Sequence, residues 1–480
     1  MVKPRVLLIN NNRLVPPVAP LALDYLGAGL EEKGIEPFLA DLAWAGEPFV
    51  FLDEAIRANG PFTLAAVTVR NLDDSSFSGR KFFLPEIKEL VARLKQKYRL
   101  PVVLGGCGFS IMPAEVMSYC GADYGVWGDG EETLAHLASR LHRGMEVASL
   151  DGLLYFRGGA VNFNSPRFAS LPEMDYLSRR PLVDNYSYFT RGGQGNLETK
   201  RGCDGTCIYC ADPLAKGKTR RFRQAHQVVE ELQNLLELGI DCFHFCDAEF
   251  NRPLFHAEEV CGALIKSGLS EKISWYAYCS PLPFTDKLAN LMKTAGCAGI
   301  NFGVDSGDEE MLSRLGRVHG REDLRRMAQH CHRHDIPFMV DLLLGGPEED
   351  RATVENSINL VKELDPLAAG MALGLRVYRD TPLEKMVRAM SDQEKASCLH
   401  GPLKGNENFL QPFYYLSPRL GEDAAAFVNS LIGDDSRFFS LDDPREDRDY
   451  SYTENRLLLE AIENGHRGAY WHILHKLRKL

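Results

Sequence analysis

The sequence predicts an α/β protein made of an N-terminal Rossmann-like parallel sheet, a partial (β/α)6 TIM-type barrel and a small, mostly helical C-terminal region. Short apolar runs alternate with helical patterns up to about residue 145, and a second such series starts at residue 196. Alternating strands and helices form parallel sheets covered by helices, and consecutive β/α units form a barrel. We therefore expect domains at 1–145 and 196–390, a connector at 146–195 and a C-terminal region at 391–480.

The first series predicts five strands, at 6–10, 37–42, 64–69, 102–106 and 124–128. The helical patterns between them carry apolar side chains on one face, the spacing that buries a stripe. Ligands of such sheets bind beyond the carboxyl ends of the strands. The polar and glycine-rich residues that end these runs are therefore candidate ligand contacts.

In the connector, two apolar stretches flank Gly158 and Gly159, a pattern that predicts a hairpin. The second series then predicts six barrel strands, at 196–200, 242–246, 274–280, 299–304, 338–344 and 371–377. The chemistry of a barrel lies at the carboxyl ends of its strands.

The C-terminal region holds an acidic stretch at 442–449 and ends in a helical pattern with a basic end. A basic amphipathic helix can bind an anionic membrane surface or a partner. The favoured interpretation is a helix that closes the barrel and exposes a charged face.

The composition is that of a folded, soluble protein, with 45% apolar and 25% charged residues among 480. A net charge of −11 argues against general nucleic-acid binding, which needs a basic field. The opening apolar run stops at Asn10, too early for a signal peptide or a membrane span, and no later run is long enough. We expect a cytoplasmic protein with no membrane span and no nucleic-acid partner.

Cys203, Cys207 and Cys210 form a CxxxCxxC loop directly after the first predicted barrel strand. Three thiolates can bind three irons of a 4Fe-4S cluster and leave the fourth iron open for a substrate or cofactor. Zinc is disfavoured because it usually needs four ligands in paired spacings. The nine other cysteines show no ligand spacing, and we expect them to pack as small apolar side chains.

A basic run follows the cysteine loop, and we keep two interpretations of it. Its side chains could pair with a carboxylate or phosphate of the substrate, or they could form a solvated surface. The run consists of Lys216, Lys218, Arg220, Arg221 and Arg223. Four further residues are expected near strand ends, with packing as the favoured role: Tyr278, Cys279, Arg376 and Tyr378.

The cysteine loop, with Tyr209 before its last cysteine, resembles that of radical S-adenosylmethionine (SAM) enzymes. Segments at 245–250, 301–307 and 344–349 also resemble this family in order and spacing. The resemblance implies that the open iron chelates SAM, that reduction yields a 5′-deoxyadenosyl radical, and that a flavodoxin or ferredoxin donates the electron. It implies SAM contacts from Tyr209, Asp247, Glu249, Gly303, Asp305, Ser306, Gly345 and Gly346.

The first domain resembles the cobalamin-binding domain of a subgroup of this family, through a Gly-Gly strand end and the run GDGEET at 128–133. The Asp-x-His-x-x-Gly signature that supplies an axial histidine is absent. The resemblance then implies that Arg70, which follows the third predicted strand, covers the lower face of cobalamin. A protonated arginine cannot coordinate cobalt, so this face would stay uncoordinated. An ion pair of Arg70 with Asp73 or Asp74 is an equally weighted alternative. The implied cobalamin contacts are Arg70, Asn71, Gly105, Gly106, Gly128 and Glu131.

These features predict a cobalamin-dependent radical SAM methyltransferase that acts on a carbon of a small molecule or natural-product intermediate. One SAM would generate the substrate radical and another would re-methylate cobalamin. The alternative is a radical SAM enzyme with a vestigial cobalamin domain, which catalyses dehydration, rearrangement, cyclisation or transfer of another SAM-derived group such as aminocarboxypropyl. An iron–sulfur electron carrier or sensor is disfavoured, because electron transfer needs neither an open iron nor a barrel.

Overall fold

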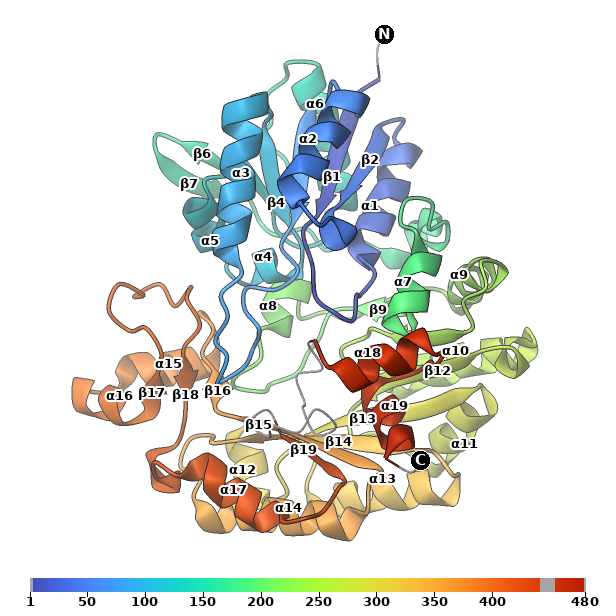
Figure 1. Ribbon diagram of the computed structural model, residues 1–480, viewed down its shortest axis with the longest axis vertical. Coiled ribbons are helices and arrows are strands. Elements are labelled where there is room, and N and C mark those ends of the chain that lie inside the picture. Colours follow the sequence, from blue (N-terminus) through green and yellow to red (C-terminus); the bar gives the residue numbers. More distant parts are fainter. Residues whose placement is uncertain (1–2, 441–453, 479–480) are drawn as a thin grey trace.

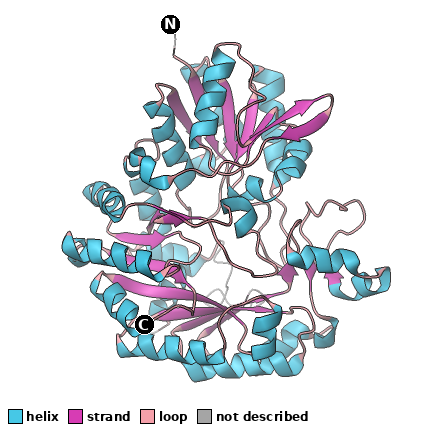
Figure 2. Ribbon diagram, turned by 180° about the vertical axis from the view of Figure 1, so that it is seen from behind, coloured by secondary structure: helices cyan, strands magenta, loops and turns pink. Residues whose placement is uncertain are grey.

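The computed structural model describes residues 3–440 and 454–478, so the acidic stretch predicted at 442–449 lies outside the described residues. It contains two α/β units, one above the other in Figure 1, with a C-terminal region beside the lower one. Figure 2 shows helices on both faces of the upper sheet and along the outer side of the lower one. The predicted fold class is confirmed.

The upper unit is a seven-stranded sheet in the order β2-β1-β3-β4-β5-β6-β7. Its first five strands are parallel, and the hairpin β6–β7 adds to the free edge of β5 in antiparallel fashion. The predicted hairpin therefore extends the first sheet past residue 145, because its backbone satisfies an otherwise unpaired edge. The strands are β1 (Arg5–Asn10), β2 (Glu36–Asp41), β3 (Leu64–Thr68), β4 (Val102–Gly105), β5 (Tyr124–Val126), β6 (Leu153–Arg157) and β7 (Ala160–Phe163).

Alternate residues of the central strands contribute to two hydrophobic cores, one on each face of this sheet. Leu7 and Ile9 of β1 pack with α3 and α5, whereas Val6 and Leu8 pack with α1 and α6. Burial on both faces explains why the parallel strands read as continuous apolar runs. The helices are α1 (Leu21–Glu32), α2 (Pro48–Asn59), α3 (Leu84–Tyr98), α4 (Cys107–Ile111), α5 (Pro113–Cys120), α6 (Glu131–His142) and, in the connector, α7 (Asn185–Gly192).

The lower unit is a parallel, seven-stranded partial barrel in the order β19-β15-β14-β13-β12-β11-β8. The sixth predicted strand starts earlier than expected, at Ala368, and β19 is an unpredicted seventh strand. The strands are β8 (Gly195–Leu197), β11 (Cys242–Phe245), β12 (Ser274–Cys279), β13 (Cys297–Asp305), β14 (Phe338–Leu344), β15 (Ala368–Leu373) and β19 (Phe438–Ser440). The helices are α8 (Asp212–Lys216), α9 (Ala225–Glu237), α10 (Leu254–Lys266), α11 (Asp286–Thr294), α12 (Glu309–Arg314), α13 (Arg321–Arg333) and α14 (Arg351–Leu364).

The C-terminal helix α19 (Tyr470–Leu477) packs against the inner side of the barrel strands. Tyr276 of β12 bonds His472 at 2.9 Å, and Trp471 approaches Gly299 of β13. The prediction that this helix closes the barrel is confirmed. Between β15 and α19 the chain also forms β16 (Leu375–Arg376), α15 (Pro382–Ala389), α16 (Asp392–Cys398), β17 (Leu399–His400), β18 (Tyr414–Tyr415), α17 (Ala424–Ile432) and α18 (Arg456–Glu463).

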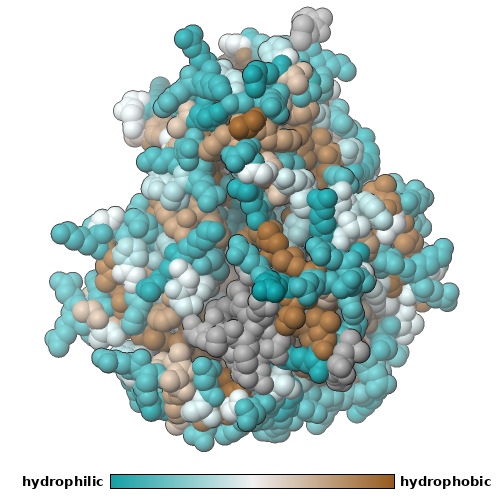
Figure 3. Space-filling model, viewed as in Figure 1, coloured by the Kyte–Doolittle hydropathy of each residue, from teal (hydrophilic) through white to brown (hydrophobic). Residues whose placement is uncertain are grey.

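The surface in Figure 3 is mostly hydrophilic, with hydrophobic side chains interspersed among charged ones. Among the described residues, none of the helices has both the length and the apolar character needed to span a bilayer.

Candidate active site

The cysteine loop is closed at its base by a two-stranded antiparallel ribbon of β9 (Lys200–Arg201) and β10 (Arg221–Phe222). Gly202 opens the loop with a φ of +91°, and a Cβ there would lie 2.1 Å from the carbonyl oxygen of Thr219. Only glycine fits such a position. The N–H of Cys203 then donates to the carbonyl of Gly217 at 2.9 Å. The chain is thus drawn tightly around the CxxxCxxC segment.

The thiols of Cys203, Cys207 and Cys210 line one cavity of about 160 Å³. Burial raises the pKa of each thiol, a cost that metal binding offsets because metals bind the thiolate. Two donors already face the sulfurs: the N–H of Gly205 lies 3.4 Å from Cys203 Sγ, and Arg317 Nη1 lies 2.9 Å from Cys207 Sγ. Such donors stabilise negative sulfur ligands.

The arrangement of the thiols also bears on the kind of metal. In the part of the chain that the structure describes, no three His, Cys, Asp or Glu side chains converge on one point as a single ion requires. A cubane instead spreads its thiolate ligands over separate irons. Three thiols that line one cavity, with N–H donors facing two of the sulfurs, fit a 4Fe-4S cluster with three protein ligands.

Four of the predicted SAM contacts line this cavity: Tyr209, Glu249, Gly303 and Asp305. The hydroxyl of Tyr209 donates to Asp305 Oδ2 at 2.5 Å. Asp305 has a φ of +64°, a conformation uncommon for residues other than glycine. The hydrogen bond holds this carboxylate at the end of β13, beside the cysteine loop.

Arg317 also lines the cavity, although it was not among the predicted site residues. Its guanidinium lies 3.4 Å from Asp305 and 3.7 Å from Glu249, and only 8% of its side chain is exposed. SAM carries a carboxylate and an ammonium group, and this wall presents charges of both signs. No motif marks Arg317, which lies 110 positions from Cys207 and reaches it only through the fold.

Two other predicted SAM contacts point away from the cavity. Asp247 is buried, with its carboxylate 3.0 Å from Lys200 Nζ and 2.6 Å from Thr199 Oγ1. Ser306 bonds Ser357 of α14 at 3.0 Å. The hydrogen-bonding groups of both side chains are used within the protein, where they stabilise the strand ends.

Gly345 and Gly346, the last two predicted SAM contacts, also lie outside the cavity lining. Their N–H groups donate to Glu349 Oε2, at 2.5 and 2.9 Å. The turn after β14 is therefore closed by its own carboxylate, and its N–H groups are not offered to a ligand.

Glu349 will make stability fall as the pH rises from about 4.5 to about 7. Burial raises the pKa of this fully buried carboxyl to about 7, against the opposing effect of the two N–H groups. The folded protein then keeps a proton that the unfolded chain has lost, so each pH step upward costs stability. The effect is at most about 3 kcal/mol.

Thermal unfolding of the wild type and of Glu349→Gln at about pH 5 and about pH 8 will measure this effect. Glutamine is neutral at both values, so the variant will lose less stability than the wild type between them. Equal losses would show that Glu349 does not titrate in this window.

The strand ends of the upper sheet point toward the barrel in Figure 1. Arg70 and Asn71 follow β3 and are exposed, and Gly105 and Gly106 end the neighbouring β4, with Gly105 paired to Thr68. Small and flexible residues leave room there for a flat macrocycle to approach the backbone. This face fits cobalamin, and the individual contacts stay predictions.

The alternative ion pair of Arg70 is wrong. Asp73 binds Arg376 at 2.9 Å, and Asp74 accepts the backbone N–H groups that close its own turn. Within the described residues, Arg70 makes no ion pair. Burial raises the pKa of Tyr278 and Tyr470, and the positive charge of Arg70 opposes this rise. The charge of Arg70 therefore lies near these two tyrosines, at the end of β12 and the start of α19.

Gly128 and Glu131, predicted to contact cobalamin, lie instead at the junction with the barrel. A Cβ on Gly128 would lie 2.2 Å from the carbonyl oxygen of Arg167. The carboxylate of Glu131 pairs with Arg201 at 2.8 Å. These contacts differ from the expected role because the GDGEE turn meets the connector and the ribbon rather than the open strand ends.

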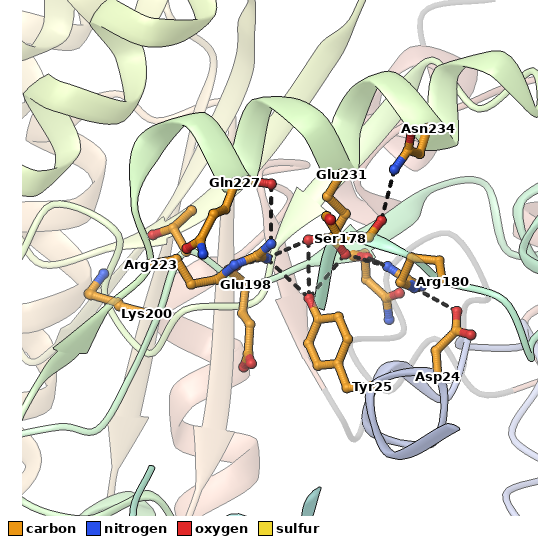
Figure 4. Close-up of polar contacts among 12 residues, drawn as sticks. Asp24, Tyr25, Ser178, Arg180, Glu198, Lys200, Arg223, Gln227, Glu231 and Asn234 are labelled. Atoms are coloured by element: carbon orange, nitrogen blue, oxygen red, sulfur yellow. Dashed lines mark hydrogen bonds and ion pairs between the residues drawn. The ribbon is translucent and has the colours of Figure 1, made fainter. Parts of the chain in front are cut away.

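A buried polar network joins the two units next to this junction (Figure 4). Arg180 of the connector donates to Asp24 of α1 at 2.6 Å and to Glu231 of α9 at 2.8 Å. Tyr25 donates to Glu231 at 3.0 Å, and Arg223 contacts the same carboxylate. Each charged side chain of the network is at most 3% exposed. The network holds α1, the connector and the barrel together.

The structure corrects both interpretations of the basic run. Its side chains form ion pairs within the protein, except for the exposed Lys218. They neither form a solvated patch nor line the cavity. The pairs are Lys216–Asp212, Arg220–Asp204, Arg221–Asp129 and Arg223–Glu231.

Comparisons with known proteins agree with this geometry. The profile of the radical SAM superfamily matches residues 197–361, and that of the B12 binding domain matches residues 9–138. Tryptophan 2-C-methyltransferase from Streptomyces laurentii is 32% identical over 454 residues, which cover 82% of this chain and 75% of that protein. The chain belongs to the cobalamin-dependent methyltransferases of the radical SAM superfamily.

Two solved structures are also similar to this chain. The radical SAM methyltransferase TsrM from Kitasatospora setae, solved with tryptophan and a SAM analogue bound, matches with a TM-score of 0.90 and 28% identity. The match covers 99% of this chain and 98% of that one. The cobalamin-dependent SAM radical enzyme OxsB shares the fold, with a TM-score of 0.68, 17% identity, and coverage of 89% of this chain and 66% of that one.

Proposed function

We propose that this methyltransferase acts on a carbon of the aromatic ring of tryptophan or of a close derivative. The observation that carries the proposal is an exposed aromatic side chain in the same cavity as the cysteines. Tyr278 lines the cavity and is 44% exposed, and the ring of His244 packs against it edge to face at 5.0 Å. Burial lowers the pKa of His244 to about 4, so the imidazole is neutral. Uncharged aromatic faces suit a flat indole ring.

Charged groups in the same cavity suit the rest of an amino acid. Asp341 and Arg252 also line the cavity, where an ammonium could meet the carboxylate of Asp341 and a carboxylate could join Arg252 beside its partner Glu249, which lies at 3.1 Å. When bound, the cluster, SAM and cobalamin supply electron transfer and the methyl group. The residues of this chain bind the ring, orient it and hold the cofactor charges.

The test is an anaerobic reaction of the reconstituted protein with SAM, a reductant and tryptophan deuterated at carbon 2 of the indole. We expect a product that has gained one methyl group and lost the deuterium. Tyr278→Ala should raise KM about tenfold, which corresponds to the loss of one aromatic contact. A product methylated outside the indole ring, or turnover of phenylalanine with equal efficiency, would contradict the proposal.

Retention of cobalamin separates this function from that of a vestigial domain. Protein reconstituted with hydroxocobalamin and desalted should keep the visible spectrum of the corrin at about one equivalent, the content of one binding domain. Loss of the spectrum on desalting would favour radical chemistry without cobalamin.

We also propose that a flavodoxin or ferredoxin in the cytoplasm reduces the cluster, and that no nucleic acid takes part. The cysteine loop exposes Asp204 and Thr206 beside the cluster ligands, which supports access for an electron donor. Reduction of the cluster by flavodoxin, followed by electron paramagnetic resonance (EPR), tests this route; no signal above that of the protein without flavodoxin would refute it.

A further inference from the structure

The ribbon that closes the cysteine loop places two arginines directly opposite each other. Arg201 of β9 and Arg221 of β10 are register partners, and both side chains are 12% exposed. Like charges at such positions are destabilising, and a two-stranded ribbon has little stability of its own. The ribbon therefore needs carboxylates from elsewhere.

The cobalamin domain supplies these carboxylates from the turn at 128–131. Asp129 lies between the arginines: it contacts Arg221 through Oδ2, and its Oδ1 is 3.4 Å from Arg201. Glu131 binds Arg201 at 2.8 Å. Glu198 completes the group from the barrel side, 2.5 Å from Arg201. Asp129 and Glu131 are 9% and 5% exposed, so solvent screens these pairs little.

The turn itself is held in place by the connector. The N–H of Asp129 donates to the carbonyl of Arg167 at 2.8 Å, and the N–H of Ala169 donates to Asp129 Oδ2 at 2.8 Å. Gly128 has a φ of +93° and no room for a Cβ beside Arg167. The turn is therefore rigid before it meets the arginines, and Arg201 is separated from the first cluster ligand only by Gly202.

We propose that the turn at 128–131 is a docking turn through which the cobalamin domain sets the position of the cysteine loop, rather than a cobalamin contact. Asp129 and Glu131 are then positioning residues for the cluster, and Arg201 and Arg221 are their receptors on the barrel. The coupling runs from the cobalamin domain into the base of the loop that carries all three cysteine ligands.

Hydrogen exchange of the holoenzyme, loaded with cobalamin and cluster, tests the proposal without relying on turnover. Asp129→Asn should speed amide exchange in segment 200–222 at least tenfold, change the EPR spectrum of the reduced cluster, and leave the cobalamin content unchanged. Arg221→Met should do the same. The double variant should add little to either single one, because both remove the same interaction.

Two further variants keep the test decisive. Arg93→Met removes an arginine that binds Asp53 within the cobalamin domain, and it should leave segment 200–222 and the EPR spectrum unchanged. Arg221→Lys keeps the charge but not the forked geometry of the guanidinium, and it replaces Arg221→Met in the test if the methionine variant does not fold. We expect it to speed exchange in segment 200–222 less than Asp129→Asn does. Loss of cobalamin in Asp129→Asn with normal exchange in segment 200–222 would overturn the proposal, as would an even rise in exchange over the whole protein.

Discussion

Replacing Cys203, Cys207 or Cys210 by alanine will abolish both the cluster and methyl transfer. Three thiolates are the minimum that holds a cluster with one open iron, and the loop offers no fourth cysteine to substitute for a lost one. The three side chains are partly exposed and line the cavity, so the fold should persist. Iron and sulfide content, together with product formation, will measure the effect.

The matched control is Cys398→Ala. Cys398 is buried in the C-terminal region, where its Sγ contacts the Met390 sulfur at 3.8 Å. This variant should keep a full cluster and lose about 1 kcal/mol of stability, as expected for a small cavity. A full iron content in any of the three loop variants would refute the ligand assignment.

Replacing Arg180 by methionine will destabilise the protein by about 3–5 kcal/mol, the cost of removing one partner from a buried charge network. Asp24 and Glu231 are 0% exposed, and without Arg180 their charges would lack a full set of partners. Thermal unfolding should show a midpoint lower by about 10 °C, since about 1 kcal/mol shifts it by 2–4 °C in large domains.

An exposed pair gives the comparison for Arg180. Arg325 binds Glu363 on the outside of the barrel, with 33% and 52% of the side chains exposed. Arg325→Met should cost less than about 1 kcal/mol. If the two arginine variants lose the same stability, the connector network does not hold the two units together.

Local patterns in the sequence predicted the elements because they depend on neighbouring residues. The β1, β3 and β4 strands each contain an uninterrupted apolar run, at 6–9, 64–67 and 102–104, as is typical of strands buried on both faces. The three cluster cysteines stand within eight consecutive residues, so their spacing is visible in the sequence without knowledge of the rest of the fold. Strand β19 escaped prediction because it is only three residues long and pairs with β15 at a distant position.

The direction of single side chains was harder to predict. Asp247 and Ser306 stand at strand ends as expected, yet both point away from the cavity. Successive side chains of a strand face opposite sides, and a shift of one residue exchanges the two faces. Apolar runs predict the ends of a strand only to within a few residues. The side of the sheet on which a terminal side chain lies therefore cannot be predicted from them.

The cysteine spacing by itself predicts the cluster ligands, and the alternation of strands and helices by itself determined the order of the two α/β units. Only the tertiary structure decided that Arg317 joins the cluster cavity, that the charge of Arg70 lies near two tyrosines, and that Arg221 and Glu131 serve the domain junction. The physical reason is that the position and role of a charged side chain depend on the group with which it pairs. These partners lie on other strands and in the other unit, and only folding brings them within hydrogen-bonding distance.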